Sequence, residues 1–377
     1  MHYRRLTIVS DTALYKKDNQ HYGFGPVVRE LEEIQGNFDE IIWIGFLRND
    51  KIDDLSMQII TSSIIKPIYL KSVGGKNLWS FLNILLNYPI MLYTITKYIL
   101  KADIIHTRAP SHPALIGGLL SFLFKNKIWW NKFAGNWAQV NPPKSYGFQR
   151  WLFKNAKHTN VTINGFWQDQ PKHCHSFENP CLTNEDIKKG SEITANKNFE
   201  APFVFSFVGR LEDAKGVSRI IESLKNIPQE KIKEVHFVGD GNKTQQYIQE
   251  ASFLGNKVFF HGFLGKNEVH SILAESHFFL LPSTASEGFP KVIAEAACYG
   301  TIPIVSNVSS IGHYINDSNG FLWNIEGQES FDKVFSSVIN TNSEQLKSKS
   351  TNIPAVAKMF TFDNYKSKLE KFVFKPR

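Results

Sequence analysis

The residues that decide the fold are 281–300, which read Leu-Pro-Ser-Thr-Ala-Ser-Glu-Gly-Phe-Pro-Lys-Val-Ile-Ala-Glu-Ala-Ala-Cys-Tyr-Gly. The run before them, from His277 to Leu281, is apolar and short enough for a buried strand. Pro290 suits the first turn of a helix, because no helical hydrogen bond needs its missing N–H there. Gly300 is a suitable helix stop. The stretch therefore predicts a strand, a turn-rich loop and a helix in succession.

Two acidic residues fall in this stretch, Glu287 in the predicted loop and Glu295 in the predicted helix. Either one alone is explained as a solvated surface acid. Their surroundings favour a ligand, because a Gly-Phe-Pro turn follows the first and alanines around the second leave space for a close approach. Free N–H groups at a helix start also attract phosphate or sugar oxygens. The pair therefore indicates a binding site above the sheet.

The sequence Glu287-Gly-Phe-Pro…Glu295-Ala resembles the E-x7-E signature of the retaining nucleotide-sugar glycosyltransferases of family 4, also called glycosyl transferases group 1. In that family the first Glu lies by the donor sugar and the second binds the ribose of the nucleotide. The resemblance implies these roles for Glu287 and Glu295. It implies further donor-binding residues at Gly288, Phe289, Pro290 and Lys291.

The resemblance also implies a GT-B fold, which is an α/β fold of two Rossmann-like doubly wound domains facing across a cleft. The C-terminal helix of that fold crosses back to the first domain. A length of 377 residues and the alternation of strand and helix patterns agree with two such domains. We expect an acceptor-binding domain over 1–182, a polar linker over 183–200, a nucleotide-sugar domain over 201–360 and a closing helix over 361–377.

The N-terminal half alternates short apolar runs with helical patterns. Gly23-Phe24-Gly25 is expected to end a polar loop before a helix from Pro26 to Ile34. Gly23 and Gly25 resemble the family's loop that approaches the donor phosphates. A dinucleotide-binding fingerprint is disfavoured, since Val28 stands where its third glycine would be. Strands are expected at 4–10, 41–46, 58–62, 68–70, 103–108, 128–133 and 161–164, with another helix over 112–124.

One position departs from the family pattern. Many relatives carry a His-Gly pair after the strand near residue 130, where this chain has Ala134-Gly135. The candidate substitutes, as N-domain or acceptor-site residues, are His106, Arg108, Lys132 and Asn136. A structural histidine or a solvated cation explains any one of them more simply. The contribution of the first domain to the site therefore stays open.

Arg210 and Lys215 are the main phosphate-binding signal of the C-terminal half. A buried strand over 202–208 runs into a turn at Gly209, and Gly216 closes the segment. Arginine offers phosphate oxygens a fork of N–H donors, and lysine offers a compact positive charge. The Arg-x4-Lys spacing after Val-Gly matches the family's diphosphate-binding pair. We therefore expect Arg210 and Lys215 to neutralise the diphosphate during catalysis, and Gly209 to lie at the donor.

The remaining strands of this half are expected at 235–241, 258–263, 278–281, 302–306 and 320–322. Gly262 ends the strand that in relatives frames the nucleotide base, so it is a further donor-site candidate. The segment from Met359 to Phe374 resembles the family's closing helix. Its Tyr365, Leu369 and Phe372 have the spacing of a buried stripe.

Together these residues imply a retaining glycosyltransferase that uses a nucleoside diphosphate sugar, a UDP-sugar in preference to a GDP-sugar. The acceptor would be a hydroxyl of a glycan or lipid-linked glycan, as in the synthesis of bacterial surface polysaccharides. No Asp-x-Asp metal motif is present, and the nearest acids to one are Asp53-Asp54. We therefore expect no metal and no cofactor beyond the donor substrate.

Other functions stay open at this point. An epimerase or phosphorylase of the same fold would use the same cleft, and a non-catalytic partner subunit would bind nucleotide sugar without turnover. The net charge of +8 and the pI of about 9.1 favour anionic partners. A nucleic-acid-binding function rests on this charge alone, since no concentrated basic-aromatic stripe is present. The oligomeric state is not predicted.

Residues 77–96 are uncharged, but polar residues and Pro89 dilute them too heavily for a membrane-spanning helix. One or two helices broken near Pro89 are expected instead. Nearby lysines leave contact with a membrane surface open. Three scattered cysteines, Cys174, Cys181 and Cys298, argue against a disulfide framework. We expect a cytoplasmic protein, with peripheral contact to the inner membrane face as an open alternative.

Overall fold

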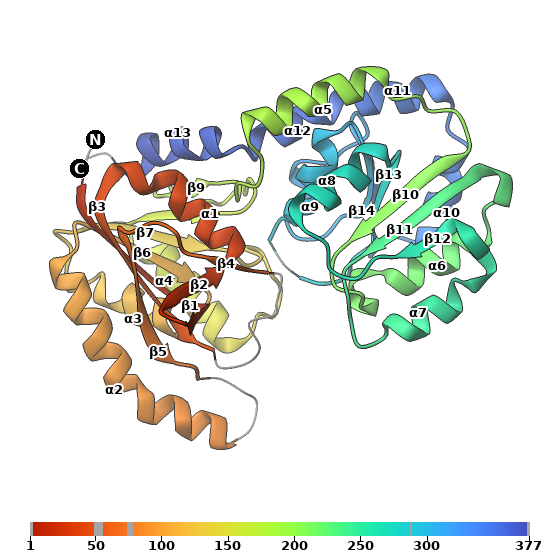
Figure 1. Ribbon diagram of the computed structural model, residues 1–377. Coiled ribbons are helices and arrows are strands. Elements are labelled where there is room, and N and C mark those ends of the chain that lie inside the picture. Colours follow the sequence, from red (N-terminus) through yellow and green to blue (C-terminus); the bar gives the residue numbers. More distant parts are fainter. Residues whose placement is uncertain (1–2, 49–55, 74–77, 287, 375–377) are drawn as a thin grey trace. The chain divides into compact units, whose positions relative to one another are not determined.

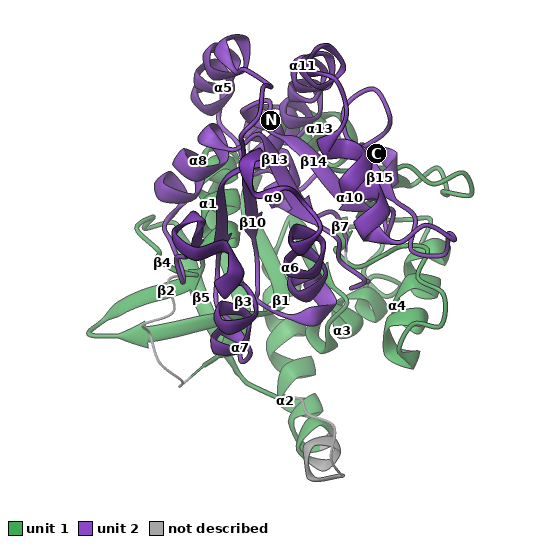
Figure 2. Ribbon diagram, turned by 90° about the vertical axis from the view of Figure 1, so that its right-hand side faces the viewer, with its two compact units in different colours: residues 1–177, 366–377 green, residues 178–365 purple. Residues whose placement is uncertain are grey.

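The computed structural model describes residues 3–48, 56–73, 78–286 and 288–374 (Figure 1). The chain divides into two compact units (Figure 2). Unit 1 comprises residues 1–177 and 366–377, and unit 2 comprises residues 178–365. Each unit contains a largely parallel sheet with helices around it. The prediction of two Rossmann-like α/β domains is therefore confirmed.

Unit 1 is built on parallel strands in the order β5-β3-β1-β6-β7-β8-β9. Apolar side chains fill these strands, as expected of a sheet that helices cover on both faces. The strands are β1 (Tyr3–Lys17), β2 (Gln20–Phe24), β3 (Phe38–Leu47), β4 (Met57–Ile59), β5 (Ile65–Lys71), β6 (Ile104–Ala109), β7 (Ile128–Phe133), β8 (Asn160–Ile163) and β9 (Cys174–Ser176). The helices are α1 (Gly25–Ile34), the 3-10 turn η1 (Gln35–Asn37), α2 (Leu78–Lys101), α3 (His112–Leu120) and α4 (Lys144–Asn155).

A hairpin replaces the polar loop that the sequence predicted before α1. β1 continues to Lys17, and β2 pairs antiparallel with it, with Leu14 opposite Gly23. Asp18 and Asn19 form the two-residue turn, both at positive φ. Two successive residues of this kind match the right-handed twist of the flanking strands. The prediction was wrong because polar residues on the exposed faces of both strands resemble a loop in composition.

Helix α2 is continuous, although the sequence predicted a break near Pro89. Its buried positions repeat every four residues at Met91, Ile95 and Ile99, which hold its second half against the sheet. Pro89 is exposed, and the helix runs past it. Within the described parts of the chain, no helix combines the length and the apolar character that a membrane crossing needs.

The end of the chain belongs to unit 1. Helix α13 (Phe362–Phe372) begins in unit 2, and residues 366–377 count with unit 1. Phe374 lies edge-on to Phe38, with ring centroids 5.8 Å apart. Tyr365 and Leu369 are buried, as their spacing predicted. The closing helix is thus held by its apolar stripe and by aromatic contacts of the residues that follow it.

Unit 2 has a sheet of parallel strands in the order β12-β11-β10-β13-β14-β15. The strands are β10 (Phe203–Val208), β11 (Ile232–Val238), β12 (Val258–Phe260), β13 (Phe278–Leu281), β14 (Ile302–Ser306) and β15 (Phe321–Trp323). The helices are α5 (Asn184–Asn196), α6 (Val217–Lys225), α7 (Thr244–Glu250), α8 (Lys266–Glu275), α9 (Lys291–Cys298), α10 (Phe331–Ile339), α11 (Ser343–Asn352) and α12 (Pro354–Met359). Short 3-10 turns are η2 (Asp213–Lys215), η3 (Gln229–Lys231), η4 (Ser252–Lys257) and η5 (Ile311–His313). All the strands predicted for this half are present.

Residues 183–200, expected to be a linker, mostly form helix α5 within unit 2. Its start is a capping box, in which Thr183 Oγ1 accepts from Asp186 N at 3.1 Å and the Asp186 carboxylate accepts from Thr183 N at 2.9 Å. A Cβ at Gly190 would lie 2.1 Å from the Cys298 carbonyl oxygen of α9. Composition hid this helix, because its buried face consists of small residues rather than large apolar ones.

Candidate functional site

The strand order of unit 2 reverses between β10 and β13, which lie side by side in the middle of the sheet. In open α/β sheets, ligands bind beyond the carboxyl ends of the strands at such a switch point. Gly209 and Arg210 follow β10 at this place, and the loop that starts at Pro282 follows β13. The candidate site is therefore built from these two strand ends.

Glycines allow the neighbouring strand ends to approach one another. Gly209 N donates to Val238 O at 3.0 Å, and Gly239 N donates to Gly262 O at 2.7 Å. A Cβ at Gly239 would lie 2.0 Å from the carbonyl oxygen of Gly209. Gly262 has a left-handed φ of +66°, which glycine adopts without strain. The predicted donor-site residues Gly209 and Gly262 therefore shape this edge of the sheet.

Arg210 and Lys215 both follow β10, as the sequence predicted. The Arg210 side chain is 75% exposed, and its Nε lies 2.6 Å from Glu212 Oε1. Lys215 is half-buried and ends the turn η2. An anionic ligand would therefore compete with Glu212 for the Arg210 guanidinium. Because the Arg210 side chain is already exposed, it could bind such a ligand without any change in the core.

The loop after β13 lies on the turn that carries Lys215. Thr284 N donates to Ala214 O at 2.8 Å. Gly216 has a φ of +91°, and a Cβ there would lie 2.4 Å from Pro282 O. Only glycine combines this backbone conformation with so close a neighbour. The fold thus brings the loop of the E-x7-E stretch to the predicted phosphate-binding pair.

Glu287, the predicted catalytic acid, lies outside the described residues. Gly288 follows it, half-buried, and Phe289 is buried in the core of unit 2. Pro290 directly precedes the first turn of α9, and Lys291 Nζ donates to Pro180 O at 2.9 Å. Helix α9 then ends before Gly300, as predicted. Phe289 and Lys291 thus have structural contacts of their own, whatever they contribute to ligand binding.

Glu295 is half-buried on α9. Burial, with a contribution from the Glu295 charge, raises the pKa of the Cys181 thiol well above its usual value. The pKa of Cys298 rises to about 12, mainly through burial and also through Asp186 and Glu295. The alanines beside Glu295 are fully buried in helix packing. The small residues around Glu295 were expected to let another backbone or a ligand come close, and the backbone of α5 does so where Gly190 lies against Cys298.

A pocket of about 500 Å³ opens beside Arg210, between the turns that follow β10 and β11. The residues that line it are Arg210, Glu212, Asp213, Ala214, Asn242 and Lys243. The Asp213 carboxylate pairs with Lys243 and accepts hydrogen bonds from Ser218 and Tyr247. These contacts, with Lys243 first, lower the pKa of Asp213 to about 2. Sequence reasoning missed Lys243, although a cation two residues after the Gly239-Asp240-Gly241 turn was a visible signal.

In unit 1, Arg108 and Lys132 meet at a carboxylate that the sequence reasoning missed. Arg108 Nη1 lies 2.9 Å from Glu30 Oε1, and Lys132 Nζ lies 3.1 Å from Glu30 Oε2. Glu30 is 1% exposed and belongs to α1, whereas the cations belong to β6 and β7. An acid on the apolar face of a helix was the available signal, because a buried carboxylate needs a paired cation.

His106 is buried in the same region. Its ring is fully buried and stacks on Trp130 at 3.6 Å, and its Nδ1 lies 3.1 Å from Trp130 O. Burial, and then the Arg108 charge, hold the pKa of His106 well below its usual value. Asn136 follows β7 and accepts from Ala138 N at 3.0 Å in its own loop. The structure thus brings His106, Arg108 and Lys132 together around α1.

Gly23 and Gly25 do not form a loop. Gly23 lies in β2, where a Cβ would come within 2.5 Å of the Trp43 ring. Gly25 begins α1, and its amide donates to Ser56 O at 2.7 Å. Packing inside unit 1 therefore explains both glycines. Asp53 and Asp54 lie outside the described residues.

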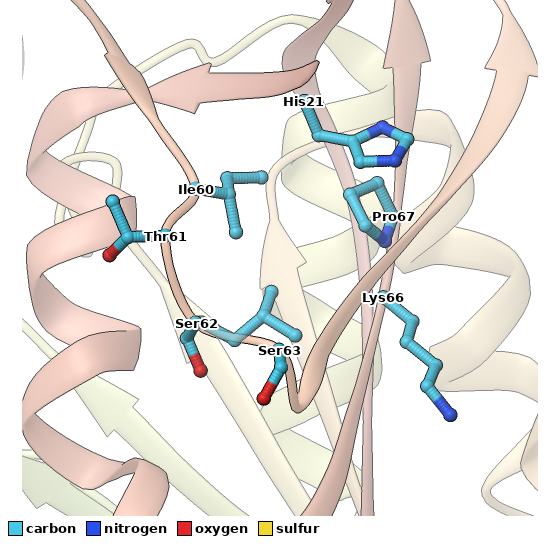
Figure 3. A pocket seen from close by; sticks show the side chains of 8 residues that line it. His21, Ile60, Thr61, Ser62, Ser63, Lys66 and Pro67 are labelled. Carbon is cyan, nitrogen blue, oxygen red and sulfur yellow. The ribbon is translucent and has the colours of Figure 1, made fainter. Parts of the chain in front are cut away.

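Unit 1 also has a pocket, of about 360 Å³, at the start of β5 (Figure 3). The residues that line it include His21, Thr61, Ser62 and Lys66. Thr61 Oγ1 donates to Glu32 at 3.1 Å, and Ser62 Oγ donates to Gln35 at 2.5 Å. Lys66 pairs with Glu40 at 2.6 Å. These polar groups serve contacts within unit 1, and the pocket lies at the amino end of β5, away from the strand ends where such sheets bind ligands.

The part of the sequence that contains the candidate site resembles a known protein family. Residues 189–353 match the family described as "Glycosyl transferases group 1". The lipopolysaccharide glucosyltransferase WaaG of Escherichia coli is 30% identical over 138 residues, which are 36% of this chain and 37% of that protein. A glycogen synthase of Clostridium botulinum is 31% identical over 143 residues, 35% of this chain and 29% of that protein. The match thus spans only about a third of these curated relatives.

Comparison of structures covers nearly the whole chain. Sucrose-phosphate synthase from Thermosynechococcus elongatus superposes with a TM-score of 0.66 at 16% identity, over 98% of both chains. HepE of Anabaena, solved in complex with UDP, gives a TM-score of 0.66 at 17% identity, again over 98% of both chains. The chain therefore has the GT-B fold, and its residues 189–353, which hold the candidate site, match the group 1 glycosyl transferases.

Proposed function

We propose that this protein is a retaining glycosyltransferase. It moves a sugar from a nucleoside diphosphate sugar, a UDP-sugar in preference to a GDP-sugar, to a hydroxyl of a glycan or lipid-linked glycan. The observation that carries the proposal is the position of Arg210 and Lys215 at the switch point of unit 2, beside the loop after β13. The family match over 189–353 and the UDP complex of a protein with the same fold support it.

Cleavage of the donor leaves negative charge on the departing diphosphate, so fixed cations nearby lower the barrier. Arg210 would turn its guanidinium from Glu212 to phosphate oxygens, and Lys215 would add charge from the adjacent turn. Lys243 lines the same pocket as Arg210 and would strengthen the local positive field. With these cations at the phosphates, the proposed reaction needs no divalent metal.

The two acids of the E-x7-E stretch have separate proposed roles. Glu295 would accept hydrogen bonds from the ribose hydroxyls, and Glu287 would hold hydroxyls of the donor sugar near the anomeric carbon. The acceptor hydroxyl would attack the face from which the diphosphate departs. The bond from the anomeric carbon to the phosphate oxygen breaks, the bond to the acceptor oxygen forms, and the acceptor proton passes to the phosphate. This course retains the anomeric configuration without a carboxylate nucleophile.

Ligand-dependent melting tests the donor site. A nucleotide that binds only the folded protein raises its melting temperature by mass action. We expect UDP to raise it more than GDP, ADP or CMP, with the same shift in excess EDTA. Arg210→Ala should lose the shift. Lys225→Ala, which removes an exposed lysine paired with Glu222 on α6, should keep it. A failure of all four nucleotides to raise the melting temperature would contradict the proposal and favour a function without nucleotide sugar.

Product analysis by proton NMR separates the remaining functions. With UDP-sugars and water or a glycan as acceptor, a retaining transferase releases UDP and a product with the donor's anomeric configuration. Inversion of that configuration would contradict the proposed course. An isomerised UDP-sugar would assign an epimerase, and a sugar 1-phosphate formed in the presence of phosphate would assign a phosphorylase. Binding without any product would assign a non-catalytic subunit.

A further inference from the structure

Helix α2 of unit 1 has apolar side chains on two opposite faces. Met91, Ile95 and Ile99 form the face that is buried against the sheet. The opposite face exposes a stripe of large apolar side chains, namely Leu86 (76%), Ile90 (61%), Tyr93 (70%) and Leu100 (55%). Spacings of four, three and seven residues place these four on one side of the helix. A surface helix normally turns charged and polar residues to that side, whereas the described part of α2 turns mostly large apolar side chains there.

Helix α3 contacts α2, and apolar side chains are exposed at its end as well. Both helices lie on the same side of the unit 1 sheet in Figure 1. The last turn of α3 and the residues after it expose Leu119 (47%), Phe122 (38%) and Leu123 (75%). These three residues and the four of α2 are here called the α2–α3 surface. Large apolar side chains that are exposed on two helices in contact, unlike scattered ones, indicate an interaction site.

The charge of the surrounding sequence is strongly one-sided. Residues 55–168 contain thirteen Lys and Arg residues but a single acid, Asp103. The whole chain has a net charge of +8, so the rest of the chain is net negative. Lys97 falls within the exposed stripe of α2, between Tyr93 and Leu100, and Lys101 ends the helix. Lys127 Nζ donates to Ala102 O at 2.6 Å, directly after the end of α2. Positive charge is therefore interspersed with the exposed apolar side chains.

We propose that the α2–α3 surface docks on an anionic lipid bilayer, with α2 lying along the headgroup region. Leucine, isoleucine and phenylalanine side chains would enter the acyl boundary, while lysines and tyrosine keep their polar ends at the headgroups. A second copy of this chain fits less well, because it would bring the same lysines face to face. A nucleic acid would use the lysines but leave the leucines in water. This inference concerns unit 1 and goes beyond the proposed function.

Vesicle co-sedimentation of the full chain tests the surface. We expect binding to vesicles that contain phosphatidylglycerol, weaker binding at high salt, and little binding to pure phosphatidylcholine. The Lys97→Glu, Lys101→Glu variant should bind phosphatidylglycerol vesicles at least about tenfold more weakly, since each lysine near the surface contributes roughly fivefold. The Ile90→Ser, Tyr93→Ser variant should lose binding. The matched control, Ile248→Ser with Phe253→Ser, removes two side chains of unit 2 that are each 39% exposed, and should bind like wild type.

Three results would overturn the inference. The first is equal loss of vesicle binding in the control and in the α2 variants. The second is no binding of the wild type to phosphatidylglycerol vesicles. The third is a wild-type dimer in light scattering that becomes a monomer in Ile90→Ser, Tyr93→Ser without any vesicle binding, which assigns the surface to a second copy. The melting temperature of each variant would be measured to check that the variant folds. Their UDP-dependent shifts, measured without lipid, separate a failure of this surface from a failure of the donor site.

Discussion

Glu30 and Lys132 form a buried ion pair that joins α1 to β7, with Lys132 Nζ 3.1 Å from the Glu30 carboxylate. The side chain of Glu30 is 2% exposed and that of Lys132 is 6% exposed. Arg108 contacts the other carboxylate oxygen from the end of β6. Charges removed from water must be paired, so this contact fixes α1 to the carboxyl-terminal halves of two strands.

Glu30→Gln should therefore destabilise the protein strongly. The substitution keeps the shape of the side chain but leaves two cations without the carboxylate, at a cost of about 3–5 kcal/mol. Urea unfolding followed by circular dichroism measures the change. Glu33→Gln on the same helix is the control. The Glu33 side chain is 36% exposed, so its ion pair with Lys366 contributes less than about 1 kcal/mol to stability. Equal stability of the two variants would contradict the buried pairing.

Gly216→Ala should damage both stability and nucleotide binding. Its left-handed backbone would strain any other residue, and the new Cβ would lie 2.4 Å from Pro282 O. We expect the free energy of unfolding to fall by about 3 kcal/mol or more. Backbone strain accounts for about 1–2 kcal/mol of this, and overpacking against Pro282 for the rest. Gly255→Ala is the matched control, since Gly255 has a φ of +58° and nothing within 4 Å of the added Cβ. If thermal unfolding showed Gly255→Ala to be less stable than Gly216→Ala, the loop after β13 could not be packed on the Gly216 turn as described.

Lys197 predicts a pH dependence of stability. Its Nζ donates to Ser276 O and Thr301 Oγ1, and burial, with the Lys347 charge, lowers its pKa from 10.5 to about 7. Between these two values the unfolded chain holds a proton that the folded chain has lost, so stability rises with pH. Lys197→Met removes this gain. The melting temperature of the wild type minus that of the variant should therefore increase from pH 7 to pH 10.

Lys189→Met controls for the general effect of alkaline pH, because Lys189 is exposed on α5, the helix that Lys197 directly follows. Its melting temperature should differ from that of the wild type by the same amount across the range. A flat difference for Lys197→Met as well would show that Lys197 titrates as an ordinary surface lysine.

Much of unit 2 could be predicted from the sequence, because its strands and turns are marked by short stretches of neighbouring residues. Each strand is a short apolar run, and β10 and β11 end at turn glycines directly after Val208 and Val238. Alternation of such strands with helices predicts a parallel sheet. Arg210 and Lys215 follow from their distance to one strand end. The contacts that hold the site together were not predictable in the same way. Thr284 reaches Ala214 only because two distant segments meet at the switch point.

Unit 1 shows where local patterns mislead. The hairpin of β1 and β2 resembles a loop in composition, since its alternating exposed residues are polar. The ion pairs of Glu30 with Arg108 and Lys132 form only where α1, β6 and β7 meet. The spacing of these residues in the sequence does not indicate that contact. Helix α5 was taken for a linker because its packing relies on Gly190, whose missing side chain carries no hydrophobic signal. Long-range packing and small buried residues therefore set the limit of the sequence analysis.

The affinities of UDP and UMP for the wild type and for Arg210→Ala test the central claim most directly. If Arg210 binds the diphosphate, the wild type should prefer UDP to UMP, and the variant should lose about tenfold or more of its affinity for UDP. Its affinity for UMP should fall less, so the preference for UDP shrinks. Lys225→Ala should keep the preference, as a control for removing a cation. An unchanged preference for UDP in Arg210→Ala, measured by calorimetry, would contradict the assignment of the diphosphate to the end of β10.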